Sequence, residues 1–164
     1  MKIILALLLI APAFAVTEAL YGSWRLVSFT RTIVATGEME APYGKAPRGI
    51  LTYGRDGRMH AILAQDVRPR KAPGMLTDQD RLELQQSFMA YTGTFSFDGR
   101  TAIHRVDLAS NETWIGSEQV RFLKLEGRRL IITTPPLDAN AAGRNAAAVL
   151  TWEKMDSPAK SLKS

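Results

Sequence analysis

Residues 22–29 read Gly-Ser-Trp-Arg-Leu-Val-Ser-Phe, and this stretch decides the fold. Successive side chains of a β-strand point to opposite faces, so strict alternation places Trp24 on one face and Arg25 with Phe29 on the other. Gly22 allows a tight turn into the strand, and Trp24 is large enough to plug one end of a barrel interior. The stretch therefore predicts the first strand of a small antiparallel β-barrel, with Gly22 and Trp24 at its structural base.

Seven further segments have the character of strands. They are predicted at residues 49–53, 58–64, 91–97, 101–108, 117–125, 129–134 and 147–154. Asp56-Gly57 and Asp98-Gly99 are strong hairpin signals, and Glu126-Gly127 marks a further turn. Eight is the strand number at which a closed barrel encloses side chains or one small ligand. The sequence thus predicts an all-β, eight-stranded antiparallel up-and-down barrel.

One short helix is predicted in the middle of the chain. Thr77 has the character of an N-cap, and Asp78 and Asp80 follow in the first turn, where the helix dipole favours negative charge. A partly amphipathic pattern then continues to about Ala90. Such a helix either covers a barrel end or packs outside the barrel as a connector.

The N-terminal residues have the features of a signal peptide. Lys2 is followed by the apolar run 3–11, and Ala13-Phe14-Ala15 is a small-x-small cleavage signal. The run is shorter than the roughly 20 residues that span a bilayer, so stable membrane insertion is not expected. The prediction is a signal peptide over 1–15, a barrel domain over 16–156, a polar tail over 157–164, and export to the periplasm or outside the cell. The alternative is an N-terminal core helix.

Composition narrows the class of protein. The chain has 164 residues, of which 46% are hydrophobic, enough for one domain with a sizeable core. The formal net charge of +5 is modest, and no nucleic-acid-binding motif is present, so nucleic acid is not an expected partner. With two histidines and no cysteine, a dedicated metal site and a disulfide are both unexpected. No phosphate or dinucleotide motif occurs, and no cofactor is predicted.

These features together resemble the lipocalin-like domain family, the single-domain calycin-type barrels of bacteria and fungi. The matching residues are 22–28, 49–53, 56–59, 91–95, His104, 114–116, 119–122, 130–136 and 150–153. The resemblance implies a barrel with a closed base and one open mouth, and it leaves the ligand class open. Better-known lipocalins differ in having a disulfide, a Thr-Asp-Tyr motif and a helix after the last strands.

His104 is the most interesting ionisable residue. Arg105 and Asp107 are expected to face water, which puts His104, Val106 and Leu108 on the inner face of their strand. A neutral interior imidazole can donate a hydrogen bond to a ligand or act as a general base. The alternative is a histidine satisfied by a hydrogen bond in the core.

Arg121 is expected to face inward with Leu123, and Gln119 belongs to the same row. An inward guanidinium is costly unless it pairs with a carboxylate, a ligand anion or an aromatic ring. It can therefore meet a ligand beside His104. The alternative, which the resemblance to lipocalins suggests, is that Arg121 closes the base by a cation–π contact with Trp24.

Aromatic side chains are the remaining candidates for a binding site. Trp114 lies in a loop, where it lines the mouth or packs under the loop. Wall candidates on the strands are Tyr53, His60, Tyr91, Phe95 and Trp152.

Three functions remain open. The first is an exported protein that binds a small hydrophobic or amphipathic molecule through His104, Arg121, Gln119, Trp114, Tyr53, Tyr91 and Phe95. The second is an isomerase, cyclase or dehydratase of small metabolites with His104 as general acid/base. The third is a fully packed barrel with a structural role in the cell envelope.

Overall fold

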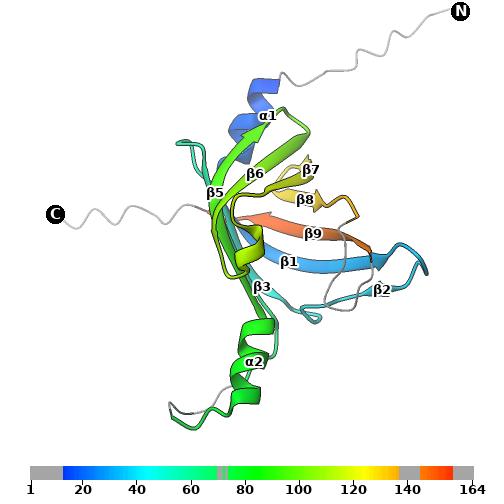
Figure 1. Cartoon of the computed structure of the whole chain (residues 1–164). Helices are drawn as coiled ribbons and strands as arrows, with labels where there is room; N and C mark the ends of the chain where they lie inside the picture. Colours follow the sequence, from blue (N-terminus) through cyan, green and yellow to red (C-terminus); the bar gives the residue numbers. More distant parts are fainter. Residues whose placement is uncertain (1–12, 70–71, 73, 137–144, 157–164) are drawn as a thin grey trace, which may run out of the picture.

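A computed structural model describes residues 13–69, 72, 74–136 and 145–156 (Figure 1). The elements in chain order are α1 (Ala13–Leu20), β1 (Gly22–Ile33), β2 (Met39–Glu40), β3 (Arg48–Tyr53), β4 (Arg58–Ala64), α2 (Asp78–Gln86), β5 (Phe88–Phe97), β6 (Thr101–Ala109), the short 3-10 helix η1 (Glu112–Trp114), β7 (Glu118–Glu126), β8 (Arg129–Thr133) and β9 (Ala146–Lys154). None of the described helices is long and apolar enough to cross a membrane.

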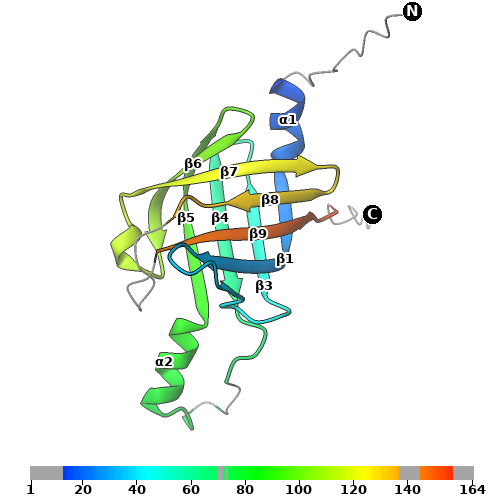
Figure 2. The same cartoon turned by 90° about the vertical axis from the view of Figure 1, so that its right-hand side faces the viewer.

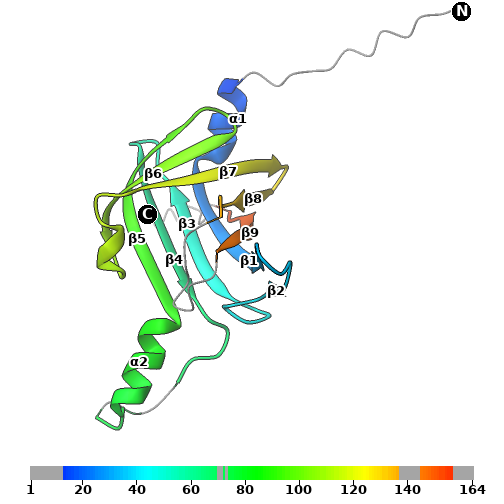
Figure 3. The ribbon, with the colours of Figure 1, turned by 45° about the vertical axis from the view of Figure 1, so that its right-hand side comes forward.

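The strands close into a barrel through β1. This strand pairs antiparallel with β3 on one side and with β9 on the other, and the remaining strands pair in chain order (Figures 2 and 3). The closed ring has eight strands, because the two-residue β2 pairs only with the far end of β1. The predicted eight-stranded up-and-down barrel is therefore confirmed.

A bulge in β1 changes which side chains face inward. Leu26 pairs with Trp152 and Ser28 with Thr151, so Val27 is the extra residue. Val27 is 45% exposed, while both Leu26 and Phe29 are buried. A bulge shifts the alternation by one residue. The expectation that Phe29 shares a face with Arg25 is wrong for this reason.

A second bulge lies in β6, opposite Gly93 of β5. Thr92 pairs with Leu108 and Gly93 with Val106, which leaves Asp107 as the extra residue. Leu108 is turned outward and is 62% exposed, contrary to the expectation that it shares the inner face with His104. A Cβ at position 93 would lie 1.8 Å from the carbonyl oxygen of Arg105, so the close approach of the two strands requires glycine.

The mid-chain helix starts where predicted and ends earlier. Thr77 and Asp80 form a capping box, and α2 ends at Gln86. Residues 88–90, predicted as helix, belong to β5 because they continue its pairing with β4. The helix extends away from the barrel (Figures 1 and 2), so it serves as an external connector and does not plug an end.

The opposite end of the barrel is closed around Trp24. The Trp24 indole Nε1 donates to the carbonyl oxygen of Leu20 at 2.9 Å, and Leu20 at the end of α1 is fully buried. The Lys154 ammonium lies 4.3 Å from the centre of the Trp24 ring and donates to the carbonyl oxygens of Ala19 and Tyr21. Gly22, with φ at +114°, makes the turn from α1 into β1. Trp24 thus lies at the base as predicted, but its cation is Lys154 and not Arg121.

Most of the predicted signal peptide and the predicted polar tail cannot be compared with this fold. Residues 1–12 and 157–164 lie outside the described residues. Residues 13–15, the predicted cleavage signal, form the first turn of α1. Helix α1 differs from the main prediction, which placed the first strand almost directly after the apolar run, and most of the residues of the alternative, an N-terminal core helix, lie outside the described residues.

Replacing Gly93 with Ala tests the close approach of β5 and β6. The added methyl group meets the Arg105 backbone, so we expect the free energy of unfolding to fall by about 1–3 kcal/mol or more. Urea denaturation measures the change. The control is Ser96→Ala on the exposed face of β5, which should stay within about 0.5 kcal/mol of wild type. Equal stability of the two variants would contradict this account of the bulge.

Candidate functional site

A cavity of about 460 Å³ occupies the barrel interior. This volume lies within the range of roughly 300–1,000 Å³ that small-molecule sites have. Its wall is mainly apolar, and the apolar lining includes Phe29, Leu51, Leu63, Met89, Ile132, Leu150 and Trp152. The polar and aromatic lining residues are Arg31, Tyr43, Tyr91, His104, Asn111, Trp114, Gln119, Arg121 and Thr134. The interior beside His104 is therefore not filled by side chains, which contradicts the hypothesis of a fully packed barrel.

His104 of β6 is held between two tyrosines from other strands. Its Nε2 lies 2.8 Å from the hydroxyl of Tyr53 on β3, and its Nδ1 lies 2.9 Å from the hydroxyl of Tyr91 on β5. The imidazole is only 1% exposed. Both ring nitrogens thus have a partner, and the interpretation of His104 as a histidine satisfied in the core is confirmed.

The burial of Tyr53 gives this hydrogen-bond chain a direction. In a neutral imidazole one nitrogen donates and the other accepts. Tyr53 is completely buried, and its hydroxyl has no other hydrogen-bond partner in the described part of the chain. A buried donor without an acceptor is costly, so Tyr53 donates to Nε2 and the proton of the imidazole is on Nδ1. The Nδ1–H group then donates to Tyr91, which leaves the Tyr91 hydroxyl proton free to donate elsewhere.

The protonation states follow from burial and from one nearby charge. Burial, with the positive charge of Arg121, lowers the pKa of His104 to about 3. Burial also raises the pKa of Tyr53 and that of Tyr91 above their usual value. All three groups are therefore neutral near pH 7. His104 lacks the free nitrogen and the near-neutral pKa of a general base, so its geometry suits a positioning role for Tyr91.

Arg121 of β7 points into the same cavity. Its Nη1 donates to the carbonyl oxygen of Val120 at 2.8 Å, and its Nη2 donates to Oε1 of Gln119 at 3.3 Å. The Gln119 amide is fixed in turn by Ser117 at 2.9 Å. Register explains the grouping, because Gln119 pairs with His104 and Arg121 with Ala102 across β6 and β7. The sequence prediction that His104, Gln119 and Arg121 meet in one place is correct in its geometry.

The predicted wall residues Tyr53 and Phe95 lie behind the cavity. Neither belongs to its lining, and their rings pack on each other with centroids 4.7 Å apart. Phe95 also meets Tyr21 near the closed end. Tyr53 therefore acts on the cavity through His104. Alternation along a strand predicts which side chains point into the barrel, but it does not predict how far along the barrel axis they lie. Tyr53 and Phe95 lie too close to the closed end to line the cavity.

Trp114 lies where the cavity reaches the mouth. It ends η1, which is capped by the Asn111 side chain, and its ring meets the ring of Tyr91 edge to face at 5.7 Å. The sequence missed two mouth residues, Arg31 and Tyr43. Arg31 forms an ion pair with Glu40 at 3.0 Å. Its inward position could have been found only by recognising the β1 bulge, because odd-numbered residues such as Phe29 and Arg31 face inward only beyond Val27.

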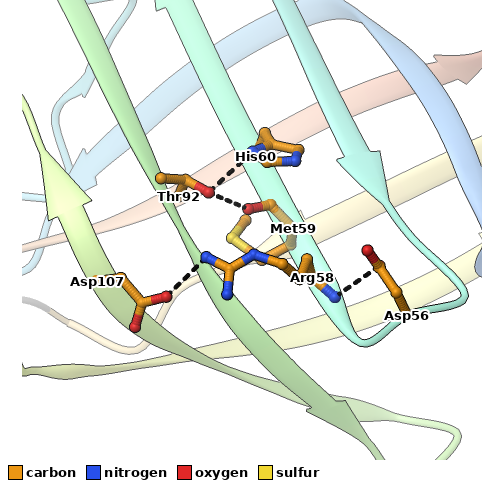
Figure 4. A network of polar contacts seen from close by, with 6 residues as sticks. All are labelled: Asp56, Arg58, Met59, His60, Thr92 and Asp107. Atoms are coloured by element: carbon orange, nitrogen blue, oxygen red, sulfur yellow. Dashed lines mark hydrogen bonds and ion pairs between the residues drawn. The ribbon is translucent and has the colours of Figure 1, made fainter.

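His60, predicted as a wall residue, lies on the outer face of β4. Its Nδ1 lies 2.8 Å from Oγ1 of Thr92, which donates to the carbonyl oxygen of Met59 at 2.9 Å (Figure 4). Nearby on the same outer face, Arg58 forms an ion pair with Asp107 at 2.7 Å. Among the described residues there is no cluster of three or more His, Cys, Asp or Glu side chains suited to a metal ion. The prediction of His60 as a wall residue is wrong.

Comparison with known proteins agrees with this architecture. The model of the lipocalin-like domain matches residues 21–155. The chain belongs to the lipocalin-like domain family. A similar protein is the 4'-hydroxy-3'-methoxypropiophenone carrier protein ppsC of Aspergillus oryzae. It is 30% identical over 88 residues, which cover 48% of this chain and 78% of that protein. The resemblance seen in the sequence is thus confirmed for this lipocalin-like barrel.

The buried imidazole should make the stability of the lipocalin-like barrel depend on pH. A histidine whose pKa is lower in the folded than in the unfolded protein contributes stability above about pH 6.5, and this contribution is lost as the pH falls towards 3. We expect the free energy of unfolding of wild type to fall more steeply between pH 6.5 and 4 than that of His104→Gln, by about 1 kcal/mol per pH unit.

Urea denaturation at several pH values measures this difference. The matched control is His60→Gln, because His60 lies exposed on the outer face and its removal should leave the wild-type pH dependence unchanged. Parallel curves for wild type and His104→Gln would show that His104 does not remain neutral in the folded protein.

Proposed function

We propose that this lipocalin-like barrel binds one small amphipathic molecule in its cavity and acts as a carrier for it. The observation that carries the proposal is the cavity of about 460 Å³, which has a mainly apolar wall and a group of polar side chains on β5, β6 and β7. Such a site gains affinity from burial of apolar surface and takes its specificity from a few placed polar groups.

The expected binding mode follows from the lining. The apolar part of the ligand packs against Leu51, Leu63 and Ile132, while its polar group meets Tyr91 and Arg121. The name of the similar Aspergillus protein supports a carrier role and suggests a first probe. 4'-Hydroxy-3'-methoxypropiophenone has an aromatic ring with hydrogen-bonding groups at both ends, so its shape and polarity suit an apolar cavity with one polar region.

Filling part of the cavity should weaken ligand binding. Ala148 of β9 lines the cavity, and its neighbour Ala147 points to the other face of the strand. We expect Ala148→Phe to weaken the binding of 4'-hydroxy-3'-methoxypropiophenone at least tenfold, and Ala147→Phe to leave the Kd within about twofold. Isothermal titration calorimetry measures the Kd, and thermal unfolding verifies that both variants fold.

Intrinsic fluorescence provides a second readout of the same binding event. Trp114 and Trp152 line the cavity, while Trp24 lies at the closed base. A ligand inside the barrel should therefore quench the emission of wild type, and Trp114→Phe should lose part of that response. Equal Kd values for Ala148→Phe and wild type would contradict binding in the cavity.

We also propose that the protein is exported, to the periplasm or outside the cell. Lys2, the apolar run 3–11 and the Ala13-Phe14-Ala15 signal support this proposal. Cleavage after Ala15 would remove the first turn of α1 and keep Leu20, which packs at the base with Trp24.

The mature protein should accordingly begin at Val16. Intact-mass measurement of the protein recovered from its host should give the mass of residues 16–164, and Ala15→Gln should block processing because the signal requires a small residue there. A protein that remains in the cytoplasm with residues 1–15 attached would contradict export.

A further inference from the structure

Arg121 is a buried charge for which the described residues supply no countercharge. Its side chain is only 6% exposed, and no carboxylate forms an ion pair with it among the described residues. Its hydrogen-bond partners are the neutral oxygens of Val120 and Gln119 and the Tyr91 hydroxyl. A guanidinium has five N–H donors, more than these three neutral partners use. Buried charges in proteins are normally paired, because desolvation of an isolated ion is costly.

The cavity as a whole has the same imbalance. Among the described residues, its ionisable lining residues are Arg31, Tyr43, Tyr91, His104 and Arg121, and no Asp or Glu belongs to the lining. His104 and both tyrosines are uncharged near pH 7, since burial lowers the pKa of His104 and raises that of each tyrosine. Arg31 at the mouth is balanced by Glu40. Within the described part of the chain, the positive charge of Arg121 is therefore the one that the lining leaves unbalanced.

A second donor lies beside this charge. The direction of the chain from Tyr53 through His104 leaves the Tyr91 hydroxyl proton free. Tyr91, His104 and Arg121 all line the cavity, and Arg121 is close enough to influence the pKa of both neighbours electrostatically. The polar region of the cavity thus offers a cationic donor and a neutral donor, a combination that suits an oxygen anion.

We propose that the cavity selects ligands with an anionic oxygen group, a carboxylate or a phenolate, which pairs with Arg121 and accepts a hydrogen bond from Tyr91. This inference rests on the proposed binding function and adds the charge of the ligand to it. The apolar walls hold the rest of the molecule, and the charged region decides which molecules are accepted.

A pair of ligands of the same shape tests the inference on the unaltered protein. The probes are 4-propylbenzoate and 4-propylbenzamide, which differ in charge and little in size. We expect the benzoate to bind at least tenfold more tightly at pH 7 by isothermal titration calorimetry. Equal affinity, or tighter binding of the amide, would overturn the inference and leave the proposed carrier function standing. Binding of neither probe would count against both.

Variants locate the effect at Arg121. Arg121→Gln should remove most of the preference for the benzoate while the amide still binds. The matched control is Arg105→Gln, which removes the same charge from the outer face of β6, where Arg105 pairs with Glu118. It should keep the preference. Arg121→Lys retains the charge and should keep part of the preference, so it remains informative if Arg121→Gln does not fold. A preference unchanged in a folded Arg121→Gln would overturn the assignment.

Absorbance gives an independent readout with 4'-hydroxy-3'-methoxypropiophenone. Its phenolate absorbs at longer wavelength than its phenol, because the ionised oxygen is conjugated with the ketone. When bound to wild type, the probe should ionise at least one pH unit lower than in buffer, a tenfold shift in the equilibrium. Arg121→Gln should abolish the shift, and Tyr91→Phe should reduce it. Ionisation of the bound probe at the same or a higher pH would contradict the proposal.

Discussion

The hydrogen bonds from Tyr53 through His104 to Tyr91 organise the interior of this barrel. They join β3, β6 and β5, which are not all neighbours in the sheet, and they satisfy a fully buried imidazole on both nitrogens. Loss of one partner would leave a buried polar group unpaired, which costs about 1–3 kcal/mol. This series of hydrogen bonds also separates two parts of the interior. Packed aromatic rings lie towards the base, and the open cavity lies towards the mouth.

Because other residues close the base of the barrel, the charge of Arg121 is available to the cavity. Trp24 is held there by Leu20 of α1 and by Lys154 of β9, so the base needs no further cation. Lys154 is partly exposed and donates to backbone oxygens, which reduces the cost of its position. The two cations thus have separate roles. Lys154 stabilises the closed end, and Arg121 lies with His104 in the region open to a ligand.

Much of this fold could be predicted from local signals in the sequence. The Asp-Gly turns and the alternation of side chains located all eight barrel strands, six of them to within one residue at both ends, and parity across one hairpin brought His104 and Arg121 together. Two of the errors share a cause, since bulges at Val27 and Asp107 reverse the parity that follows them. A bulge depends on how two strands fit, as the contact of Gly93 with the Arg105 backbone illustrates, and no single segment encodes it. Arg31 was missed and Leu108 misplaced for that reason.

The apolar and the polar parts of the cavity wall contribute to ligand binding in different ways. Apolar contact is proportional to area and does not depend on direction, so Leu51, Leu63, Ile132 and their neighbours limit the size of a ligand more than its chemistry. Hydrogen bonds and charge depend on geometry, and the groups that provide them lie on paired strands with fixed register. Because Gln119 and Ser117 hold Arg121, and Tyr53 and His104 hold Tyr91, both donors are oriented before a ligand enters. Binding then costs little reorganisation, and a ligand that lacks an acceptor leaves two buried donors unsatisfied.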